Sequence, residues 1–317
     1  MSFFKTLGKI IRGIVICILS IILLVVGGSF IYNQVQIKKD EGYWKNPPGQ
    51  MVEVDGHKMH VYTEGEGEHT IVLLTGFGTA CPYVDFLPIC QKLSSDYKVV
   101  IVERFGYGLS DTAGGKRSFD KIVDHDREAL KQAGIEGPYV LCPHSISGLE
   151  SLIWAQNYPE EVEAIVGMDM SDVSIRDDKE FNATVMQFVR AVRASGLIRL
   201  LNVQIGESSV DINSEEGKLQ QAVTFKSYMN KDVISEITNV KESCDLIDSK
   251  PLPETPTLQL IAQKRTAEEY EAWKASHQKI VDASKNGKLV ELDCNHYVYK
   301  EEPDRVVQEI KEFLEKV

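Results

Sequence analysis

The sequence lacks several features that would mark whole classes of protein. Its 35 basic residues are outnumbered by 47 acidic ones, which gives a net charge of −12. Surfaces that bind nucleic acid are basic, so we expect no nucleic-acid partner. The 23 glycines and 11 prolines are ordinary for 317 residues, which excludes collagen-like and low-complexity chains.

Cysteine is also sparse. The six cysteines form no C-x-x-C pair, which argues against a zinc ribbon or a thioredoxin-type site. Cys142 lies inside an apolar segment, where we expect it to pack as a small hydrophobic residue. A disulfide between Cys81 and Cys90 is left open by the sequence.

Long hydrophobic runs are missing except for one. Residues 13–32 contain no charged side chain, and as a helix they would extend about 30 Å, the thickness of a bilayer's hydrocarbon core. The first 39 residues carry a charge of +5 and the remainder −17. Three basic residues precede the run, so we expect the N-terminus to stay in the cytoplasm. A cleaved signal peptide is the alternative, but no clear A-x-A cleavage site follows.

This pattern predicts a single-pass protein of the cell membrane, with the lipid bilayer as a partner and the globular part outside the cytoplasm. We expect a cytoplasmic N-terminus, a transmembrane helix, a linker and an exported domain at residues 1–12, 13–32, 33–50 and 51–317.

The exported part alternates between strand and helix patterns. A hairpin with period-two alternation turns at Asp55-Gly56. Continuous apolar runs follow, as in strands covered on both faces, and helical patterns separate them. The expected strands are 69–75, 97–103, 139–142, 164–168, 257–262 and 288–292. The fold class is therefore α/β, a mostly parallel sheet of about eight strands with helices on both faces.

Residues 173–254 interrupt this alternation and predict helices at 182–195, 214–230 and 232–239. An insertion of this size between two strands is a candidate cap over a site, or else a set of extra packing helices. Its acidic residues are expected to be solvated in so acidic a domain, namely Glu180, Glu207, Asp211, Glu215, Glu216 and Glu236.

The sharpest motif is Pro143-His-Ser-Ile-Ser-Gly148, where a buried strand turns directly into a helix. Such a turn projects a serine, here Ser145, above the sheet as a candidate nucleophile. The alternative is an ordinary helix start in which Ser145 or Ser147 is only an N-cap.

A second loop, Thr75-Gly-Phe-Gly78, follows an earlier buried strand. Its Phe77 N–H and the Ile146 N–H after Ser145 are candidate donors for an oxyanion hole. A dinucleotide-binding loop is the competing interpretation, but its third glycine position holds Cys81.

A nucleophilic serine needs a base, and His296 is the best placed of seven histidines. It follows the last predicted strand and precedes the last helix, at the same sheet edge as Ser145. The acid that orients it is less defined. Asp169 ends the strand after the serine and is the first candidate; Asp172, Glu268 and Glu269 remain alternatives.

Taken together, four segments resemble the α/β-hydrolase superfamily over about residues 51–317: Thr75–Gly78, Glu103–Asp111, Pro143–Gly148 and Asn295-His296. The order nucleophile, acid, histidine is also that of the superfamily. The sequence departs from this pattern in three respects. Thr75 replaces a common histidine. Pro143 and Ser147 replace two glycines that usually flank the nucleophilic serine in the turn between strand and helix. The common acid position after residue 262 holds no aspartate.

The resemblance implies a serine hydrolase with Ser145 as nucleophile, His296 as base and Phe77 and Ile146 as oxyanion donors, and it implies no metal or cofactor. We expect a carboxylesterase or acyl hydrolase with a Ser-His-Asp triad, acting on a small-molecule acyl ester or amide. The alternatives are a peptidase of the proline-iminopeptidase type and a binding protein that keeps the fold without catalysis.

Overall fold

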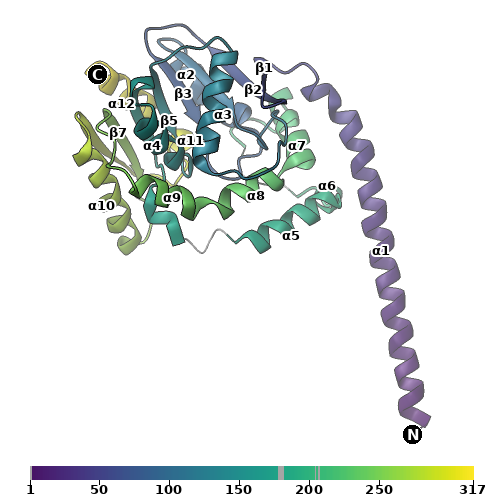
Figure 1. Cartoon of the computed structure of the whole chain (residues 1–317). Coiled ribbons are helices and arrows are strands. Elements are labelled where there is room, and N and C mark those ends of the chain that lie inside the picture. The colour runs from purple at the N-terminus through teal and green to yellow at the C-terminus, as the bar shows by residue number, and fades with distance from the viewer. Residues whose placement is uncertain (1, 178–181, 204, 206–207) are drawn as a thin grey trace.

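The chain folds around one eight-stranded sheet, and a long helix projects from the globule (Figure 1). This computed structural model describes residues 2–177, 182–203, 205 and 208–317. The sheet order is β1-β2-β4-β3-β5-β6-β7-β8. β2 is antiparallel to both β1 and β4, and the remaining neighbours are parallel. The predicted fold class is thus confirmed.

The strands lie close to their predicted positions. Their bounds are β1 Gln50–Val54, β2 His57–Glu64, β3 Thr70–Leu74, β4 Lys98–Glu103, β5 Tyr139–Pro143, β6 Val162–Met168, β7 Thr257–Ala262 and β8 Gly287–Leu292. Every residue of β3, β5 and β7 is buried, which explains their continuous apolar composition.

Helices cover both faces of the sheet and bury one hydrophobic cluster on each. These helices are α2 Pro82–Leu93, α3 Phe119–Gln132, α4 Ser147–Asn157, α10 Ala267–Ala283, α11 Val298–Glu301 and α12 Pro303–Leu314. Ile122, Leu149 and Ile247 belong to one cluster, and Phe86, Ile310 and Phe313 to the other.

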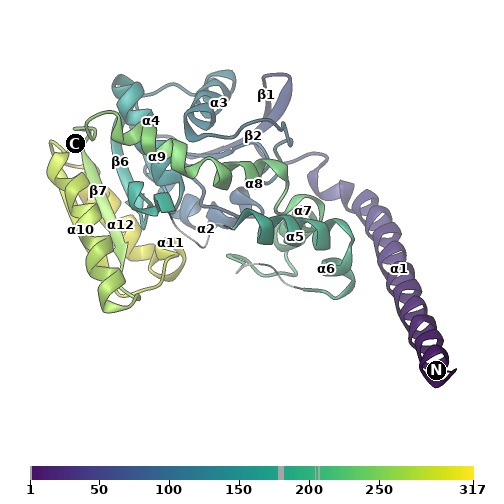
Figure 2. The same ribbon diagram turned by 60° about the horizontal axis from the view of Figure 1, so that its bottom comes forward.

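The insertion is helical where the sequence predicts helices. Its described residues form the short 3-10 turn η2 and five α-helices: η2 Val173–Asp177, α5 Ala183–Ala194, α6 Leu197–Leu200, α7 Glu215–Ser227, α8 Lys231–Thr238 and α9 Val240–Asp248. Figure 2 shows α5, α8 and α9 lying across the globule on the side that comes forward in this view.

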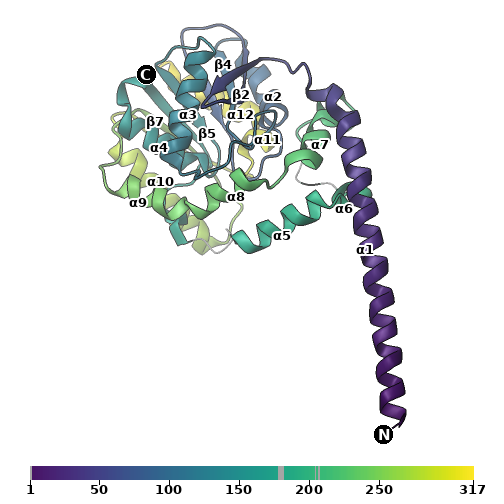
Figure 3. The ribbon, with the colours of Figure 1, turned by 45° about the vertical axis from the view of Figure 1, so that its right-hand side comes forward.

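The N-terminal helix α1 runs without a break from Ser2 to Trp44, so it includes most of the predicted linker. Within the described residues it is the one helix long and apolar enough to cross a membrane. Its C-terminal part lies beside α6 and α7 (Figure 3). There Ser29 and Asn33 are buried, and the Trp44 ring lies 4.7 Å from the Lys226 ammonium of α7.

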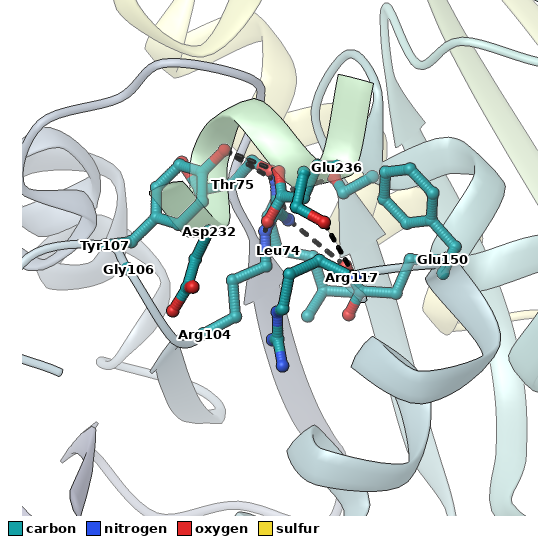
Figure 4. A network of polar contacts seen from close by, with 12 residues as sticks. Leu74, Thr75, Arg104, Gly106, Tyr107, Arg117, Glu150, Asp232 and Glu236 are labelled. Carbon is teal, nitrogen blue, oxygen red and sulfur yellow. Dashed lines mark hydrogen bonds and ion pairs between the residues drawn. The ribbon is translucent and has the colours of Figure 1, made fainter. Parts of the chain in front are cut away.

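A buried cluster of charges joins the insertion to the sheet (Figure 4). The Arg104 guanidinium, after β4, donates to both carboxylate oxygens of Glu236 on α8 at 2.9 and 3.1 Å. It also donates to the Thr75 carbonyl at 2.9 Å and to Glu150 of α4 at 3.3 Å. Tyr107 donates to Glu236 at 2.7 Å. The expectation that Glu236 is solvated was therefore wrong, because a buried arginine requires a buried counter-charge.

The other acidic residues of the insertion and the cysteines lie in different environments. Glu180 and Glu207 lie outside the described residues, whereas Asp211 and Glu215 are exposed and Glu216 is half-buried. No disulfide joins the six cysteines. The Cys81 thiol lies against Glu103, and the Cys90 thiol lies against Glu64.

We predict that Glu236→Ala lowers the free energy of unfolding by about 3–5 kcal/mol, because it leaves the buried Arg104 charge with Glu150, at 3.3 Å, as its one remaining carboxylate partner in the described chain. Urea unfolding of the full chain in detergent micelles measures this. Glu242→Ala is the matched control, since Glu242 forms an exposed ion pair with Lys116, and it should cost less than about 1 kcal/mol. Equal losses in the two variants would contradict the role given to Glu236.

Candidate active site

Ser145 occupies the corner between β5 and α4, in a left-handed backbone conformation with φ 55°. A non-glycine residue takes this conformation only where the surrounding structure imposes it. The Ser145 carbonyl accepts hydrogen bonds from the N–H groups of Gly148 at 2.9 Å and Ser171 at 2.7 Å. A Cβ on Gly148 would lie 2.0 Å from the Ser171 carbonyl oxygen, so this position requires glycine.

Neither serine of this turn caps α4. The N-cap residue is Ile146, and no side chain caps the helix. The Ser147 hydroxyl is buried and donates to the carbonyls of Leu74 and His144, each at 2.8 Å. The N-cap interpretation was therefore wrong, and Ser147 instead ties the turn to the end of β3.

The 75–78 loop packs directly against this turn. A Cβ on Gly76 would lie 3.0 Å from the Ser145 Cβ and 2.8 Å from His144 Nδ1. Because glycine has no Cβ, the 75–78 loop can approach the turn at Ser145 closely. A site in which backbone N–H groups of both segments bind one anion requires such an approach. The Ile146 N–H donates to no group of the described chain, and helix α4 begins at the next residue.

Asp169 and His296 form a close pair. Asp169 directly follows β6, and its Oδ2 lies 2.6 Å from His296 Nδ1. The centroid of the His296 ring lies 4.6 Å from that of His144, the neighbour of Ser145, with the two rings tilted by 39°. Among the described residues no hydrogen bond joins the Ser145 hydroxyl to the His296 ring, and such bonds commonly tighten only when substrate is bound.

Asp169 is fully buried, and four donors surround its carboxylate. Besides His296, these are the Ala262 N–H at 2.9 Å, the Trp273 Nε1–H at 2.8 Å and the Arg265 guanidinium at 2.5 Å. Burial by itself raises the pKa of Asp169, but the bond from His296 and the charge of Arg265 outweigh it and hold that pKa below its usual value. The carboxylate is therefore ionised at neutral pH.

Sequence reasoning missed Arg265 and Trp273. Arg265 occupies the region after β7 where an acid is common in the superfamily. Its guanidinium pairs with the carboxylate of Asp169, the acid that follows β6. The exchange was visible in the sequence as a basic Gln263-Lys264-Arg265 run at that position. Nothing in the sequence marked Trp273, which reaches Asp169 from the middle of α10.

The three alternative acids lie in other environments. Glu269 accepts from the Thr266 N–H and hydroxyl in a capping box at the start of α10, and Glu268 beside it is exposed. Asp172 accepts from the Ser174 N–H at 2.8 Å. Asp169 is thus the one of the four carboxylates that contacts His296 in the described chain.

The sequence was compared with protein families and with known proteins, and both comparisons found matches. Residues 69–303 match the family described as alpha/beta hydrolase fold. The chain belongs to this family. An uncharacterized Bacillus subtilis protein, YbdG, is 31% identical over 99% of both chains. An uncharacterized Schizosaccharomyces pombe protein, C23C11.06c, is 38% identical over 31% of this chain and 18% of its own.

Solved structures share the fold of this α/β hydrolase. A Thermogutta terrifontis esterase has a TM-score of 0.61 at 20% identity, covering 84% of this chain and 96% of its own. A Bacillus megaterium epoxide hydrolase has a TM-score of 0.60 at 19% identity, covering 84% and 100%. A Salmonella enterica protein described as a putative acyltransferase has 0.61 at 18%, covering 84% and 95%. At these identities the likeness shows the fold alone.

His144 gives this family member a pH-dependent stability. Burial and the nearby His296 hold the pKa of His144 well below 6.5, so the folded protein disfavours the charged ring. The unfolded chain takes up the proton as pH falls through about 6.5, so stability is present above that pH and declines below it. We predict that His144→Leu and His144→Gln flatten this decline by up to about 1.4 kcal/mol per pH unit.

Urea unfolding of the wild type and both variants at a series of pH values between about 7.5 and 5.5 measures the effect. The slope is the readout, because either variant also changes packing and shifts the whole curve. Parallel curves for all three proteins would contradict the assignment.

Proposed function

We propose that this α/β hydrolase is a membrane-anchored serine hydrolase of the carboxylesterase or acyl-hydrolase type. The observation that carries the proposal is the Asp169–His296 pair at 2.6 Å. The His296 ring contacts the ring of His144, which precedes a serine in left-handed conformation. The esterase named above has the same fold, which is consistent with this activity.

In the proposed reaction, the Ser145 oxygen attacks the acyl carbonyl carbon, and His296 Nε2 takes the serine proton. Asp169 accepts from the Nδ1–H and thereby fixes the tautomer that leaves Nε2 free as a base. The imidazolium that forms is stabilised by the Asp169 carboxylate and returns its proton to the departing alcohol. Water then attacks the acyl-enzyme by the same route and releases the acid.

Negative charge develops on the carbonyl oxygen during both steps. The proposed donors are the N–H groups of Phe77 and Ile146, which belong to the two segments held together at Gly76. The N-terminal end of α4 adds its dipole to the same place. Backbone donors make the identity of the Phe77 side chain unimportant for this role.

The peptidase alternative is weaker. It would use carboxylates of the insertion to bind a substrate amine, but Glu236 is already paired with Arg104 in the interior. The binding-protein alternative predicts that no ester is turned over. Strain at Ser145 and four donors around a buried carboxylate favour catalysis, because both are costly features for a surface that only binds.

The anchoring part of the proposal rests on α1. Its uncharged stretch at residues 13–32 is largely exposed, and a water-exposed surface of this size and composition would be unstable. We propose a single span with residues 1–12 in the cytoplasm and the hydrolase domain outside, following the basic residues that precede the stretch.

We predict that Ser145→Ala and His296→Ala each lower kcat/KM for p-nitrophenyl butyrate by about 10⁴-fold or more in the full-length protein, because they remove the nucleophile and the base. Asp169→Asn should lower it by about 10²–10⁴-fold through the loss of tautomer control. The corresponding p-nitroanilide, assayed in parallel, separates esterase from amidase activity.

Asp172→Asn is the matched control, because Asp172 is a buried carboxylate three residues away that bonds a backbone N–H rather than His296. It should keep kcat/KM within about threefold. A wild type that is folded but turns over neither ester nor anilide would overturn the proposed activity, and equal losses for Asp169→Asn and Asp172→Asn would remove Asp169 from the mechanism.

A further inference from the structure

One segment of the insertion has a composition unlike the rest of the globule. Residues 182–203, which contain α5 and α6, hold three arginines and no acidic residue. They do so in a domain whose net charge after residue 39 is −17. A basic helical segment with apolar side chains is the composition of helices that lie in a membrane interface.

The same segment exposes apolar side chains that no described residue covers. Phe188 on α5 is 68% exposed, and Leu201 after α6 is 70% exposed. Of the eight large hydrophobic residues described as exposed outside α1, five fall in this segment; they are Val185, Phe188, Leu200, Leu201 and Val203. Scattered exposed residues need no explanation, whereas a concentration of this kind marks a binding surface.

The segment is attached to α1 at the level where the uncharged stretch ends. A Cβ on Gly196 would lie 2.5 Å from the Ser29 carbonyl oxygen. The Arg199 guanidinium donates to the Asn33 side chain at 3.0 Å and pairs with Asp40 at 2.6 Å. Ser29 is three residues before Tyr32, about 4.5 Å along a helix axis. A membrane crossed by residues 13–32 therefore has its outer surface beside α6.

The orientation of α5 and α6 agrees with this level. In Figures 1 and 3 both helices lie on the side of the globule from which the N-terminal half of α1 projects. The α5–α6 segment and the membrane-crossing part of α1 are thus on the same side of the protein. A bilayer that surrounds the membrane-crossing part of α1 would therefore also contact the α5–α6 segment.

α5 packs toward the candidate active site. Its inner residues Met186 and Val189 pack against the cluster of Tyr107, Met229 and Val233, and Phe77 of the 75–78 loop packs against the same cluster. Its outer residue Phe188 is exposed. α5 and the proposed oxyanion loop therefore pack against the same small cluster, and the opposite side of α5 faces the region where we place the bilayer.

We propose that the α5–α6 surface lies in the headgroup region of the bilayer that α1 spans, and that the site draws its substrate, an acyl ester that partitions into lipid, from there. The proposal rests on the anchoring and the esterase activity of the proposed function. Phe188, Leu200 and Leu201 enter the interface, and Arg190 supplies positive charge to anionic headgroups.

The test places a tryptophan on this surface in the full-length chain. Phe188→Trp is a conservative change at an exposed site, and Met51→Trp is its control, because Met51 is an exposed apolar residue on the edge strand β1. Both proteins are reconstituted in vesicles of phosphatidylglycerol and phosphatidylcholine with brominated acyl chains. After subtraction of the wild-type signal, Phe188→Trp fluorescence should fall about twofold relative to unbrominated vesicles, and Met51→Trp should be unchanged.

A second arm measures activity. Leu200→Ser combined with Leu201→Ser should lower hydrolysis of a long-chain ester in vesicles about fivefold or more, while hydrolysis of water-soluble p-nitrophenyl butyrate stays within twofold. Similar quenching at positions 188 and 51, or Phe188→Trp fluorescence that instead depends on protein concentration in lipid-free micelles, would overturn the proposal; the latter indicates a second copy of the chain on the surface.

The failures of the two proposals can be told apart. Flotation with vesicles of the variant that combines Leu200→Ser and Leu201→Ser reports anchoring by α1 without these two apolar contacts, and turnover of the soluble ester by the wild type reports the chemistry of Ser145. A protein that floats and hydrolyses the soluble ester but shows no quenching at position 188 overturns the lipid-facing surface alone.

Discussion

The buried guanidinium of Arg104 is the interaction on which the arrangement of the site depends. It holds the Thr75 carbonyl at the start of the 75–78 loop, Glu150 on α4 and Glu236 on α8 of the insertion. A charge removed from water must be matched on several sides, so one arginine fixes the relative position of three segments that are distant in the sequence. The turn at Ser145 and the 75–78 loop, which meet at Gly76, are therefore held in position by the contacts of Arg104.

A second constraint operates at the carboxyl ends of β5 and β6, where both Ser145 and Asp169 have a positive φ, 55° and 49°. Each of these residues comes within two positions after the end of a parallel strand, in a conformation that an ordinary side chain avoids. The backbone turns sharply and leaves both side chains at the same edge of the sheet. Asp169 keeps its charge in the interior because Arg265, Trp273 and a backbone N–H bond it together with His296.

Much of this fold was predictable from the sequence, because its signals are local. Continuous apolar runs gave the buried strands, and the glycines at 76 and 148 stand where the chain approaches itself too closely for a Cβ. The pairing of Arg104 with Glu236 was not predictable, because it joins residues 132 positions apart and looks in the sequence like two ordinary surface charges. The same holds for Arg265, whose partner lies 96 positions earlier.

The central claim is that Ser145 acts as a nucleophile in the folded protein. The direct measurement is peptide mass mapping after exposure of the full chain to a fluorophosphonate, which reacts with activated serines. We predict a single adduct on the peptide that contains Ser145, and none when the protein is unfolded before exposure, because the activation belongs to the fold. A folded protein without an adduct, or with its adduct on another serine, would contradict the claim.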